Sequence, residues 1–382
     1  MIKAEKLKIG FRVDSSYEIG TGHIMRCLSL AEGLQEKNAE VIFISRKLSG
    51  NIIDVIKKQG YKVFTLKYDA DILKPNALKC RYKEWLGVPY ERDIQETKEI
   101  LVKRHLSLDW LVVDHYAIDK KWEEQIRPFT NKIMVIDDLA DRSHDCDLLL
   151  NQNIFPDMEG RYKNLIPVYS KKLFGPKHAL LRREFAEARK RLKERNGIVK
   201  RILIFFGGID KTNETEKALK ALRILNEPSI EIDVVVGKMN ERKDTIRRYC
   251  ESMPKTRFYC QIDNMAEMMA SADMAICAGG IATWERCCVG LPSLVVTTAD
   301  NQIEAIRILD KRSILRYLGE NTKVSADYIA EDVRLLLKSR QLLTQYSRNS
   351  LMLVDGLGVR RCASEVVLYG SMEKRELKLE VS

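Results

Sequence analysis

The sequence lacks the features that would place the protein in a membrane or outside the cell. No apolar run is long enough to span a bilayer. The opening residues, MIKAEKLKIGF, lead at once into a strand pattern and contain no apolar core of a signal peptide. The 9 cysteines show no paired metal-ligand spacing, which is typical of a reducing compartment. We therefore expect a soluble, cytoplasmic protein without stable membrane insertion.

Several catalytic and metal-binding signatures are also missing. The sequence contains no P-loop, no HExxH and no GxSxG motif. A group of acidic residues does stand close together, without a histidine or glutamate at a ligand spacing, and comprises Asp137, Asp138, Asp141, Asp145 and Asp147. Turn and cap roles explain most of these aspartates. We predict no metal site and no cofactor.

The sequence carries an excess of positive charge, formally +11. Much of it lies in residues 182–201, RREFAEARKRLKERNGIVKR. This stretch lacks the interleaved aromatic residues of a surface that stacks nucleic-acid bases. We interpret it as a solvated helix face near a domain junction, and expect no nucleic-acid partner. The positive field favours an anionic small molecule as substrate.

The length of 382 residues predicts two domains. Strand and helix patterns alternate up to residue 150, prolines at 156, 167 and 176 interrupt them, and a second series starts at residue 201. We place the boundary between residues 1–180 and 181–382, with room for the last helix to pack back on the first domain. Each series predicts an α/β fold, a parallel sheet with helices on both faces. Two such domains imply a ligand cleft between them.

The expected elements can be given by residue range. We expect strands at 9–13, 41–44, 61–66, 110–113, 132–136, 148–150, 201–206, 231–236, 257–261, 274–277 and 294–297. We expect helices at 24–34, 52–58, 92–105, 120–129, 184–195, 213–225, 244–252, 265–270, 283–289 and from 304 onward. Residues 67–92, which contain Pro75 and Pro89, are expected to be irregular.

One stretch organises the functional interpretation. Residues 9–13 alternate as in a strand, residues 19–22 form a tight glycine-containing turn, and apolar residues follow at helical spacing over 24–34. In open α/β sheets, ligands bind where such turns leave the carboxyl ends of strands. His23 falls at or just before the start of the helix.

The position of His23 predicts a chemical role. The positive end of a helix disfavours the imidazolium form, and a neutral imidazole can serve as a general base. Gly20 and Gly22 would let the backbone approach a ligand closely. The alternative is an ordinary turn with a surface histidine, because Met25 stands where a dinucleotide-binding motif needs its third glycine.

Glycine-rich segments after later strands are candidate contacts for phosphates. Ala278-Gly279-Gly280 precedes a helix, and free N–H groups at a helix N-terminus bind phosphate well. Glu285, one turn into that helix, is a candidate acceptor for ribose hydroxyls. Gly207-Gly208 is a second candidate contact for phosphate or sugar. The alternatives are plain tight turns and an exposed helical glutamate.

Polar segments also follow two other strands. Residues 300–302, Asp-Asn-Gln, offer side-chain amides for sugar hydroxyls, and their alternative is an ordinary polar loop. Residues 114–116, Asp-His-Tyr, end a buried strand and are candidates to face a cleft. Buried polar groups satisfied by the backbone are the alternative there. Cys287 and Cys288, adjacent on an expected helix, are interpreted as structural.

Five motifs, in this order, carry a resemblance to a known family: IGTGHIMRCLSLAEGL, VDHYAIDKKWE, IDDLADRSHDCDLLLNQN, FGPKHALLRREF and AGGIATWERCCVGLPSLVVTTADNQ. Together they resemble the hydrolases of pseudaminic acid biosynthesis that cleave UDP-2,4-diacetamido-2,4,6-trideoxy-β-L-altropyranose. That family is similar to the UDP-GlcNAc transferase of murein synthesis, and the resemblance implies a two-domain GT-B fold. It covers roughly residues 8–310. One departure is Ile281, where many relatives have a serine, which removes a possible hydroxyl contact to phosphate.

The resemblance implies roles for particular residues. It implies His23 as the base that activates water and Tyr116 as a catalytic neighbour. Glycines of the AGG motif and Glu285 would hold UDP. The motifs and the resemblance together predict as substrate-binding residues Asp14, Gly20, Gly22, Arg26, His115, Gly207, Gly208, Ala278, Gly279, Gly280, Thr283, Glu285, Asn301 and Gln302.

The implied activity is metal-free, inverting hydrolysis of the anomeric C–O bond, which releases UDP and the free sugar. A diphosphate is a good leaving group that helix N–H groups can stabilise, so no second carboxylate is needed. The resemblance places this reaction in the supply of pseudaminic acid for flagellin glycosylation. The alternatives are a GT-B glycosyltransferase that uses a UDP-amino sugar, and a non-catalytic module that binds nucleotide sugars.

Overall fold

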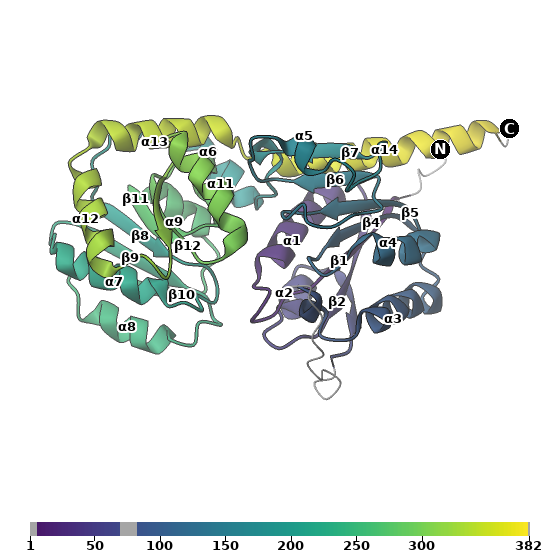
Figure 1. Ribbon diagram of the computed structural model, residues 1–382, viewed down its shortest axis with the longest axis horizontal. Helices are drawn as coiled ribbons and strands as arrows, with labels where there is room; N and C mark the ends of the chain where they lie inside the picture. Colours follow the sequence, from purple (N-terminus) through teal and green to yellow (C-terminus); the bar gives the residue numbers. More distant parts are fainter. Residues whose placement is uncertain (1–5, 69–81, 381–382) are drawn as a thin grey trace. The chain divides into compact units, whose positions relative to one another are not determined.

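A computed structural model of the protein describes residues 6–68 and 82–380 (Figure 1). The chain divides into two compact units. The first comprises residues 1–180 together with 358–382, and the second comprises residues 181–357. The sequence assigned all of 181–382 to the second domain, with the last helix free to pack back on the first.

The first unit contains a seven-stranded sheet in the order β3-β2-β1-β4-β5-β6-β7. Its strands are β1 (Lys8–Val13), β2 (Glu40–Arg46), β3 (Lys62–Leu66), β4 (Leu108–Asp114), β5 (Thr130–Ile136), β6 (Leu148–Asn151) and β7 (Lys171–Phe174). All neighbouring strands pair in parallel, as the alternating pattern predicts. The sequence did not predict β7, which is short, lies at the sheet edge and begins with two exposed lysines.

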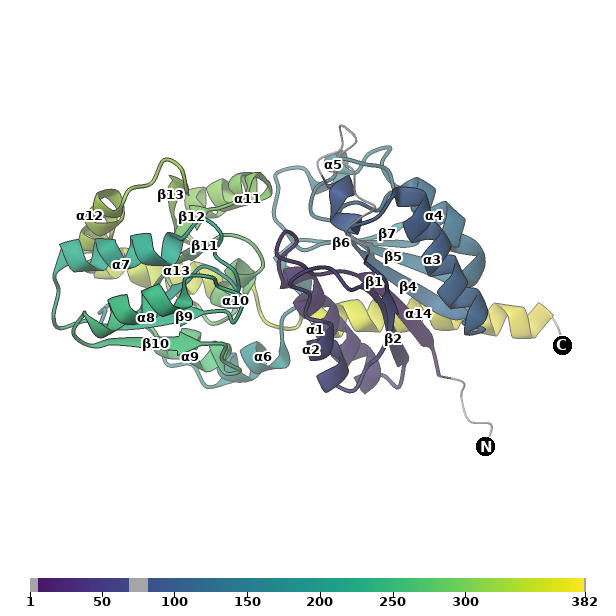
Figure 2. The same ribbon diagram turned by 90° about the horizontal axis from the view of Figure 1, so that it is seen from below.

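Helices cover both faces of this sheet (Figure 2). They are α1 (Gly22–Glu36), α2 (Ile53–Lys58), η2 (Lys83–Leu86), α3 (Tyr90–Lys103), α4 (Lys120–Ile126), η3 (Arg127–Phe129), α5 (Met158–Arg161), η4 (Pro176–His178) and α14 (Gly358–Glu380). Alternate strand residues point to opposite faces, so the core splits in two. One half packs residues such as Phe11 and Phe43 against α1, α2 and α14. The other packs residues such as Ile44 and Val113 against α3 and α4.

The last helix belongs to the first unit. Cys362, Ala363 and Val366 of α14 are fully buried in the core half that contains α1. Close contact requires a glycine on the facing helix, because a Cβ on Gly33 would lie 2.4 Å from Cγ1 of Val359. The helix thus closes one face of the first sheet.

The second unit contains a six-stranded parallel sheet in the order β10-β9-β8-β11-β12-β13. Its strands are β8 (Arg201–Phe205), β9 (Glu231–Val236), β10 (Thr256–Cys260), β11 (Met274–Ala278), β12 (Ser293–Thr297) and β13 (Arg316–Glu320). Its helices are α6 (Arg183–Lys190), α7 (Glu214–Leu225), α8 (Lys243–Glu251), α9 (Met265–Ser271), α10 (Ala282–Cys288), α11 (Asp300–Lys311), α12 (Ala326–Leu337) and α13 (Arg340–Leu353). The main core packs α7, α8, α12 and α13 against the sheet.

The basic stretch of residues 182–201 is not simply a solvated helix face. Its helix, α6, ends at Lys190, five residues earlier than the pattern predicts. Arg189 donates to the carbonyls of Cys288 and Leu351, each at 2.8 Å, near the C-terminal ends of α10 and α13. Arg195 donates at 3.1 Å to two carbonyls in the last turn of α9. These arginines satisfy the unpaired carbonyls of helix ends, which corrects the prediction.

Among the residues that the structure describes, no helix combines the length and apolar character needed to cross a membrane. Cys287 and Cys288 lie on α10 and are buried, in keeping with a structural role.

Candidate active site

The first sheet has a topological switch point between β1 and β4. From β1 the chain continues to β2 and β3 on one side, and from β4 it continues to β5, β6 and β7 on the other. In open parallel sheets, ligands bind outside the carboxyl ends of the strands at such a point. His23 is the second residue of α1, which follows β1, and Asp114 is the last residue of β4. The strand order thus brings these two residues together.

His23 and Asp114 form a buried histidine–carboxylate pair. Nδ1 of His23 lies 2.6 Å from Oδ1 of Asp114. Burial by itself raises the pKa of Asp114, but the charge of Arg26 and the contact with His23 hold that pKa well below its usual range. An ionised carboxylate only accepts hydrogen bonds, so the proton lies on Nδ1 of His23. Nε2, which makes no hydrogen bond within the described chain, is left to accept a proton.

Arg26 and Asp138 connect this pair to Tyr116. Nε and Nη2 of Arg26 donate to the two oxygens of Asp114 at 2.7 and 2.6 Å, and Nη1 donates to Oδ2 of Asp138 at 2.7 Å. The hydroxyl of Tyr116 donates to the same oxygen of Asp138 at 2.6 Å. The Tyr116 ring meets His23 edge-on, with 4.7 Å between ring centroids. The side chains of His23, Asp114, Arg26, Asp138 and Tyr116 thus form a closed ring of contacts.

Two roles predicted from the sequence change as a result. Arg26 is only 1% exposed and its three nitrogens are engaged with aspartates, so it is not available to bind substrate. Burial and the carboxylate of Asp138 raise the pKa of Tyr116 well above its usual value. Its hydroxyl is therefore a fixed donor rather than a group that exchanges protons. We assign both residues to positioning His23 and Asp114.

Asp14 and His115, also predicted to bind substrate, lie in the interior. Oδ1 of Asp14 accepts from the backbone N–H of Arg46 at 2.6 Å and forms an ion pair with Nη1 of Arg12, also at 2.6 Å. Oδ2 of Asp14 lies 3.4 Å from Nε2 of His115, and Nδ1 of His115 accepts from the N–H of Ala117 at 3.1 Å. Burial lowers the pKa of His115. The fully buried guanidinium of Arg12 needs a carboxylate partner, which explains why Asp14 points inward.

The turn before His23 has the backbone geometry that glycine allows. Gly20 has a φ of +81°, in the left-handed region, and its N–H donates to the carbonyl of Ser16 at 2.9 Å. A Cβ at Gly20 would meet nothing within 4 Å. Gly22 is the first residue of α1. The two glycines stand next to His23, and their contact with a ligand stays a prediction.

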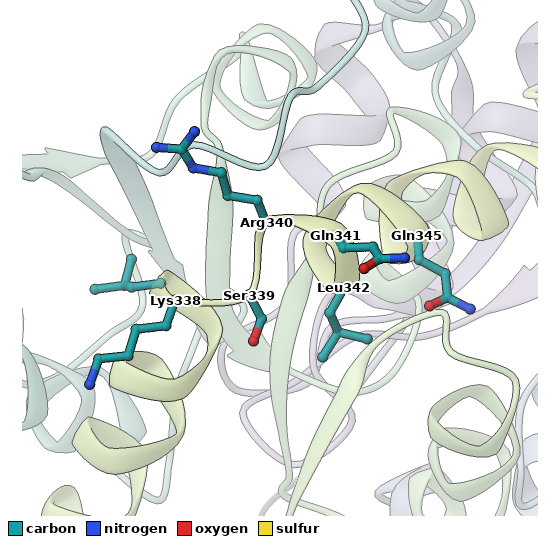
Figure 3. Close-up of a pocket in the computed structure, with 7 residues that line it drawn as sticks. Lys338, Ser339, Arg340, Gln341, Leu342 and Gln345 are labelled. Carbon is teal, nitrogen blue, oxygen red and sulfur yellow. The ribbon is translucent and has the colours of Figure 1, made fainter.

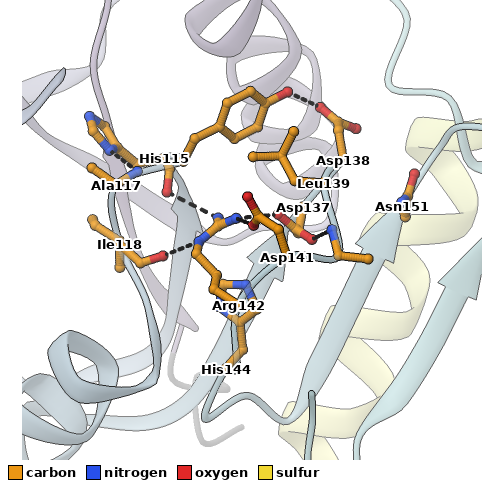
Figure 4. A network of polar contacts seen from close by, with 12 residues as sticks. His115, Ala117, Ile118, Asp137, Asp138, Leu139, Asp141, Arg142, His144 and Asn151 are labelled. Atoms are coloured by element: carbon orange, nitrogen blue, oxygen red, sulfur yellow. Dashed lines mark hydrogen bonds and ion pairs between the residues drawn. The ribbon is translucent and has the colours of Figure 1, made fainter. Parts of the chain in front are cut away.

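A second polar network braces the segment that carries Tyr116 (Figure 4). Arg142 donates to the carbonyl of Ile118 at 2.7 Å and to Asp137 and Asp141 at 2.9 Å each. Arg127 pairs in the same way with Asp145 and Asp147. Arginine partners, more than the turn and cap roles predicted, therefore account for the acidic cluster. Within residues 6–68 and 82–380, no group of three or more His, Cys, Asp or Glu side chains is arranged to hold a metal ion.

The second sheet has its own switch point, between β8 and β11. Gly207-Gly208 follows β8 and Gly279-Gly280 follows β11, and these two strands are neighbours. Gly207 and Gly280 have left-handed φ values of +90° and +94°. Two of the predicted glycine turns thus lie at adjacent carboxyl ends of strands, where this fold binds ligands.

Gln302 packs against the turn after β11. A Cβ on Gly279 would lie 2.9 Å from Oε1 of Gln302, an oxygen that accepts from the N–H of Thr298 at 3.0 Å. The sequence placed residues 300–302 in a strand-end cluster, but they form the first turn of α11. Asn301 is exposed there. The structure therefore brings together Gln302 and the Gly279-Gly280 turn.

Three further predicted residues lie on or beside α10. Thr283 is buried and its hydroxyl accepts from Arg286 at 3.1 Å, so it faces the interior and not a ligand. The carbonyl of Ala278 accepts from the same arginine at 3.1 Å. The side chain of Glu285 is only 13% exposed and lies 3.3 Å from Nη2 of Arg182. Glu285 is thus a paired, mostly buried carboxylate rather than a surface glutamate.

The sequence indicated Asp114 as a candidate to face a cleft but not as the partner of His23, and it indicated no site role for Asp138 or Trp85. Asp114 stands in the VDHY segment and Asp138 in the IDD segment, but periodicity does not show which of several aspartates reaches His23. Trp85 of η2 lies with its ring centroid 6.1 Å from that of His23. It lies within residues 67–92, which were predicted to be irregular and of which the structure describes 67–68 and 82–92, so the pattern gave no signal for it.

A separate hollow of about 880 Å³ opens beside the turn between α12 and α13 (Figure 3). It is lined by Leu337, Lys338, Ser339, Arg340, Gln341, Leu342 and Gln345. None of the predicted site residues belongs to this lining.

The chain is similar to known proteins over part or most of its length. The family model of the glycosyltransferase family 28 C-terminal domain matches residues 202–352. The chain is 29% identical over 307 residues to an uncharacterized protein of Methanocaldococcus jannaschii, covering 78% of this chain and 57% of that protein. It is 28% identical over 273 residues to the UDP-2,4-diacetamido-2,4,6-trideoxy-β-L-altropyranose hydrolase of Campylobacter jejuni, covering 71% of this chain and 84% of the hydrolase.

Solved structures show the same architecture. The crystal structure of MurG from Acinetobacter baumannii matches with a TM-score of 0.63 at 14% identity, covering 95% of this chain and 99% of MurG. At that identity the likeness concerns the fold. Two parallel sheets, each with a switch point and helices, together with this match give the chain a two-domain GT-B fold, as predicted.

Proposed function

We propose that the protein hydrolyses the anomeric C–O bond of a UDP-activated amino sugar. The observation that carries the proposal is the His23–Asp114 pair at the switch point of the first sheet. A histidine whose Nδ1 is held by an ionised carboxylate presents Nε2 as a base. The name of the Campylobacter relative, and the GT-B fold itself, support the substrate class.

The proposed step needs one base and no metal. Nε2 of His23 takes a proton from water while the water oxygen attacks the anomeric carbon. The bond from that carbon to the diphosphate oxygen breaks, and UDP leaves with the electron pair. Asp114 stabilises the imidazolium that forms, because it already accepts the Nδ1 proton at 2.6 Å. Direct attack by water gives the inverted anomer.

The second unit is proposed to hold UDP. The Gly279-Gly280 turn and Gln302 would bind the diphosphate through backbone N–H groups and a side-chain amide. Glu285 would accept from the ribose hydroxyls, in exchange for part of its contact with Arg182. Asn301, exposed at the start of α11, would reach the sugar or phosphates.

The finer assignment follows the sequence motifs. We propose UDP-2,4-diacetamido-2,4,6-trideoxy-β-L-altropyranose as substrate and a cytoplasmic place in pseudaminic acid biosynthesis. The motifs around His23, Tyr116 and Glu285, and the activity for which the Campylobacter relative is named, support this choice.

The test is reaction in ¹⁸O-water, followed by NMR and mass spectrometry. We expect the label on C1 of the released sugar and none in UDP, with the inverted anomer appearing first, before mutarotation. Label in a phosphate, or release of UMP and a sugar phosphate, would make the protein a pyrophosphatase and refute the role of His23 at carbon.

A glycosyltransferase is the second candidate, favoured by the family 28 match over residues 202–352. In that reaction a sugar hydroxyl replaces water at the same carbon. Incubation with the nucleotide sugar and no acceptor separates the two, since only a hydrolase releases UDP stoichiometrically with free sugar. A non-catalytic binding module would bind UDP and release nothing.

A further inference from the structure

An aromatic wall stands beside the proposed base, formed by Tyr82, Trp85 and Tyr116. The Trp85 and Tyr116 rings stack at 21° with centroids 5.3 Å apart. Tyr82 meets Trp85 edge-on at 4.9 Å and Tyr116 at 5.3 Å. Trp85 also meets His23 edge-on at 6.1 Å. The wall is therefore continuous with the site of the proposed reaction.

The wall is held in place rather than left on a loose segment. Leu86, next to Trp85, is fully buried in the core half formed with α3 and α4. Gly87 has a φ of +67°, and a Cβ there would lie 2.4 Å from Cδ2 of Leu48. This close packing fixes η2, while Tyr82 and Trp85 themselves stay half-buried. A tryptophan held partly open beside a base exposes apolar area that a ligand can cover.

We propose that the aromatic wall is a subsite for a methyl-bearing substituent at C4 or C6 of the sugar, and that Trp85 makes the protein discriminate in favour of 4-acetamido or 6-deoxy sugars. The proposal rests on the proposed function, because it assigns the wall to the sugar of the same substrate. Aromatic faces attract C–H groups and offer nothing to a hydroxyl, which would lose its water there. One methyl group in such a pocket is worth a discrimination of about 10–200-fold.

The test compares kcat/KM for two substrates, UDP-2,4-diacetamido-2,4,6-trideoxyhexose and UDP-GlcNAc, in the full-length protein. Trp85→Ala should lower the preference for the first substrate by at least about 10-fold, while Trp85→Phe, which keeps an aromatic face, should retain most of it. Tyr169→Ala, at an aromatic residue that is 62% exposed, is the matched control and should change neither value. An equal loss of activity on both substrates in Trp85→Ala would show a merely structural role and overturn the proposal.

Saturation-transfer NMR supplies a second readout that does not need turnover. With the uridine protons as internal reference, saturation of the C6 methyl or the C4 N-acetyl methyl should be strong in the wild type and weaker in Trp85→Ala. The methyl that responds identifies the substituent against the wall. If the wild type hydrolyses neither substrate, the proposed function fails, and this signal still tests the wall. If hydrolysis occurs and both methyl saturation and preference are unchanged in Trp85→Ala, only the wall proposal fails.

Discussion

The substitution Asp114→Asn isolates the role of the carboxylate behind His23. Oδ1 of Asp114 accepts from Nδ1 of His23 and from Nη2 of Arg26, both at 2.6 Å, and Oδ2 accepts from Nε of Arg26 at 2.7 Å. An asparagine of the same shape can place only one oxygen in this arrangement. Its NH₂ group must then face a donor, either the guanidinium or the imidazole.

The expected effect on catalysis is large. An NH₂ group facing His23 favours the tautomer with its proton on Nε2, which cannot take a proton from water. We expect kcat to fall by about 10²–10⁴, the range for losing a correctly oriented base. We also expect a loss of about 3 kcal/mol in the free energy of unfolding, because a buried charge pair loses one partner. This is the lower end of the range of about 3–5 kcal/mol for removing one partner of a buried ion pair, because Asp138 still pairs with Arg26.

The chain offers a matched control for this experiment. Glu123 and His144 form a second buried carboxylate–histidine pair, with Nδ1 of His144 2.7 Å from Oε1 of Glu123. The side chain of His144 is only 1% exposed, against 9% for His23, and its Nε2 is buried without a partner. Glu123→Gln should therefore cost similar stability and leave kcat within about threefold of the wild type, since no reacting atom meets that pair.

The assay is UDP release at 25 °C, with the folded fraction of each variant fixed by urea unfolding. Rates are compared only per folded molecule. If Asp114→Asn and Glu123→Gln show the same kcat, the reasoning from tautomer to catalysis is wrong. If both lose activity in proportion to unfolding, Asp114 serves stability alone.

Four further substitutions test the remaining residues of the site and the control pair. His23→Ala should lower kcat by about 10²–10⁴ and leave the Kd for UDP nearly unchanged; turnover within a few-fold of wild type, in parallel with the exposed-residue control His105→Ala, would remove His23 from catalysis. Tyr116→Phe should cost about 1–2 kcal/mol of unfolding free energy through the lost bond to Asp138 but lower kcat by less than about tenfold; a loss as deep as that of His23→Ala would restore a proton-transfer role to Tyr116. Glu285→Ala should weaken UDP binding by about 1–3 kcal/mol by calorimetry, and an unchanged Kd in a folded variant would show that Glu285 serves only Arg182. Burial lowers the pKa of His144 but Glu123 raises it further, so the net pKa is above the ordinary value; the stability lost in His144→Gln should be largest below about pH 6.5 and shrink as the pH rises through the folded pKa, and a pH-independent difference in urea unfolding would contradict this.

Much of the fold was open to prediction because it depends on local periodicity. Apolar strand runs such as 110–113 and helical spacing such as 214–225 are visible in any short window, and so the two parallel-sheet units were expected. Strand β7 was missed because its lysines break the apolar pattern at an edge position. The basic stretch after residue 182 was misinterpreted because its arginines bind carbonyls at the ends of helices that are distant in the sequence. The residues next to each arginine in the sequence give no sign of those partners.

The candidate site, like the fold, could be predicted from the sequence only in part. The glycine turn and the start of the helix predict from sequence alone that His23 lies at a strand end. They do not identify its partner. Asp14, Asp114 and Asp138 all end strands or follow them, and sequence gave no reason to prefer one. Asp14 turned inward to the buried Arg12, while Asp114 met His23.

The sequence by itself determined the alternation of strands and helices, the three glycine-containing turns and the position of His23 at the start of α1. Only the tertiary structure decided that His23 meets Asp114 across 91 residues and that Arg26, bound to the same Asp114, reaches Asp138 across 112. The physical reason is the strand order: β1 pairs with β4 rather than β3, and a buried guanidinium must find carboxylates among whatever the neighbouring strand ends present. Periodicity reports which face of an element is apolar, whereas partners across a switch point exist only once the sheet is assembled.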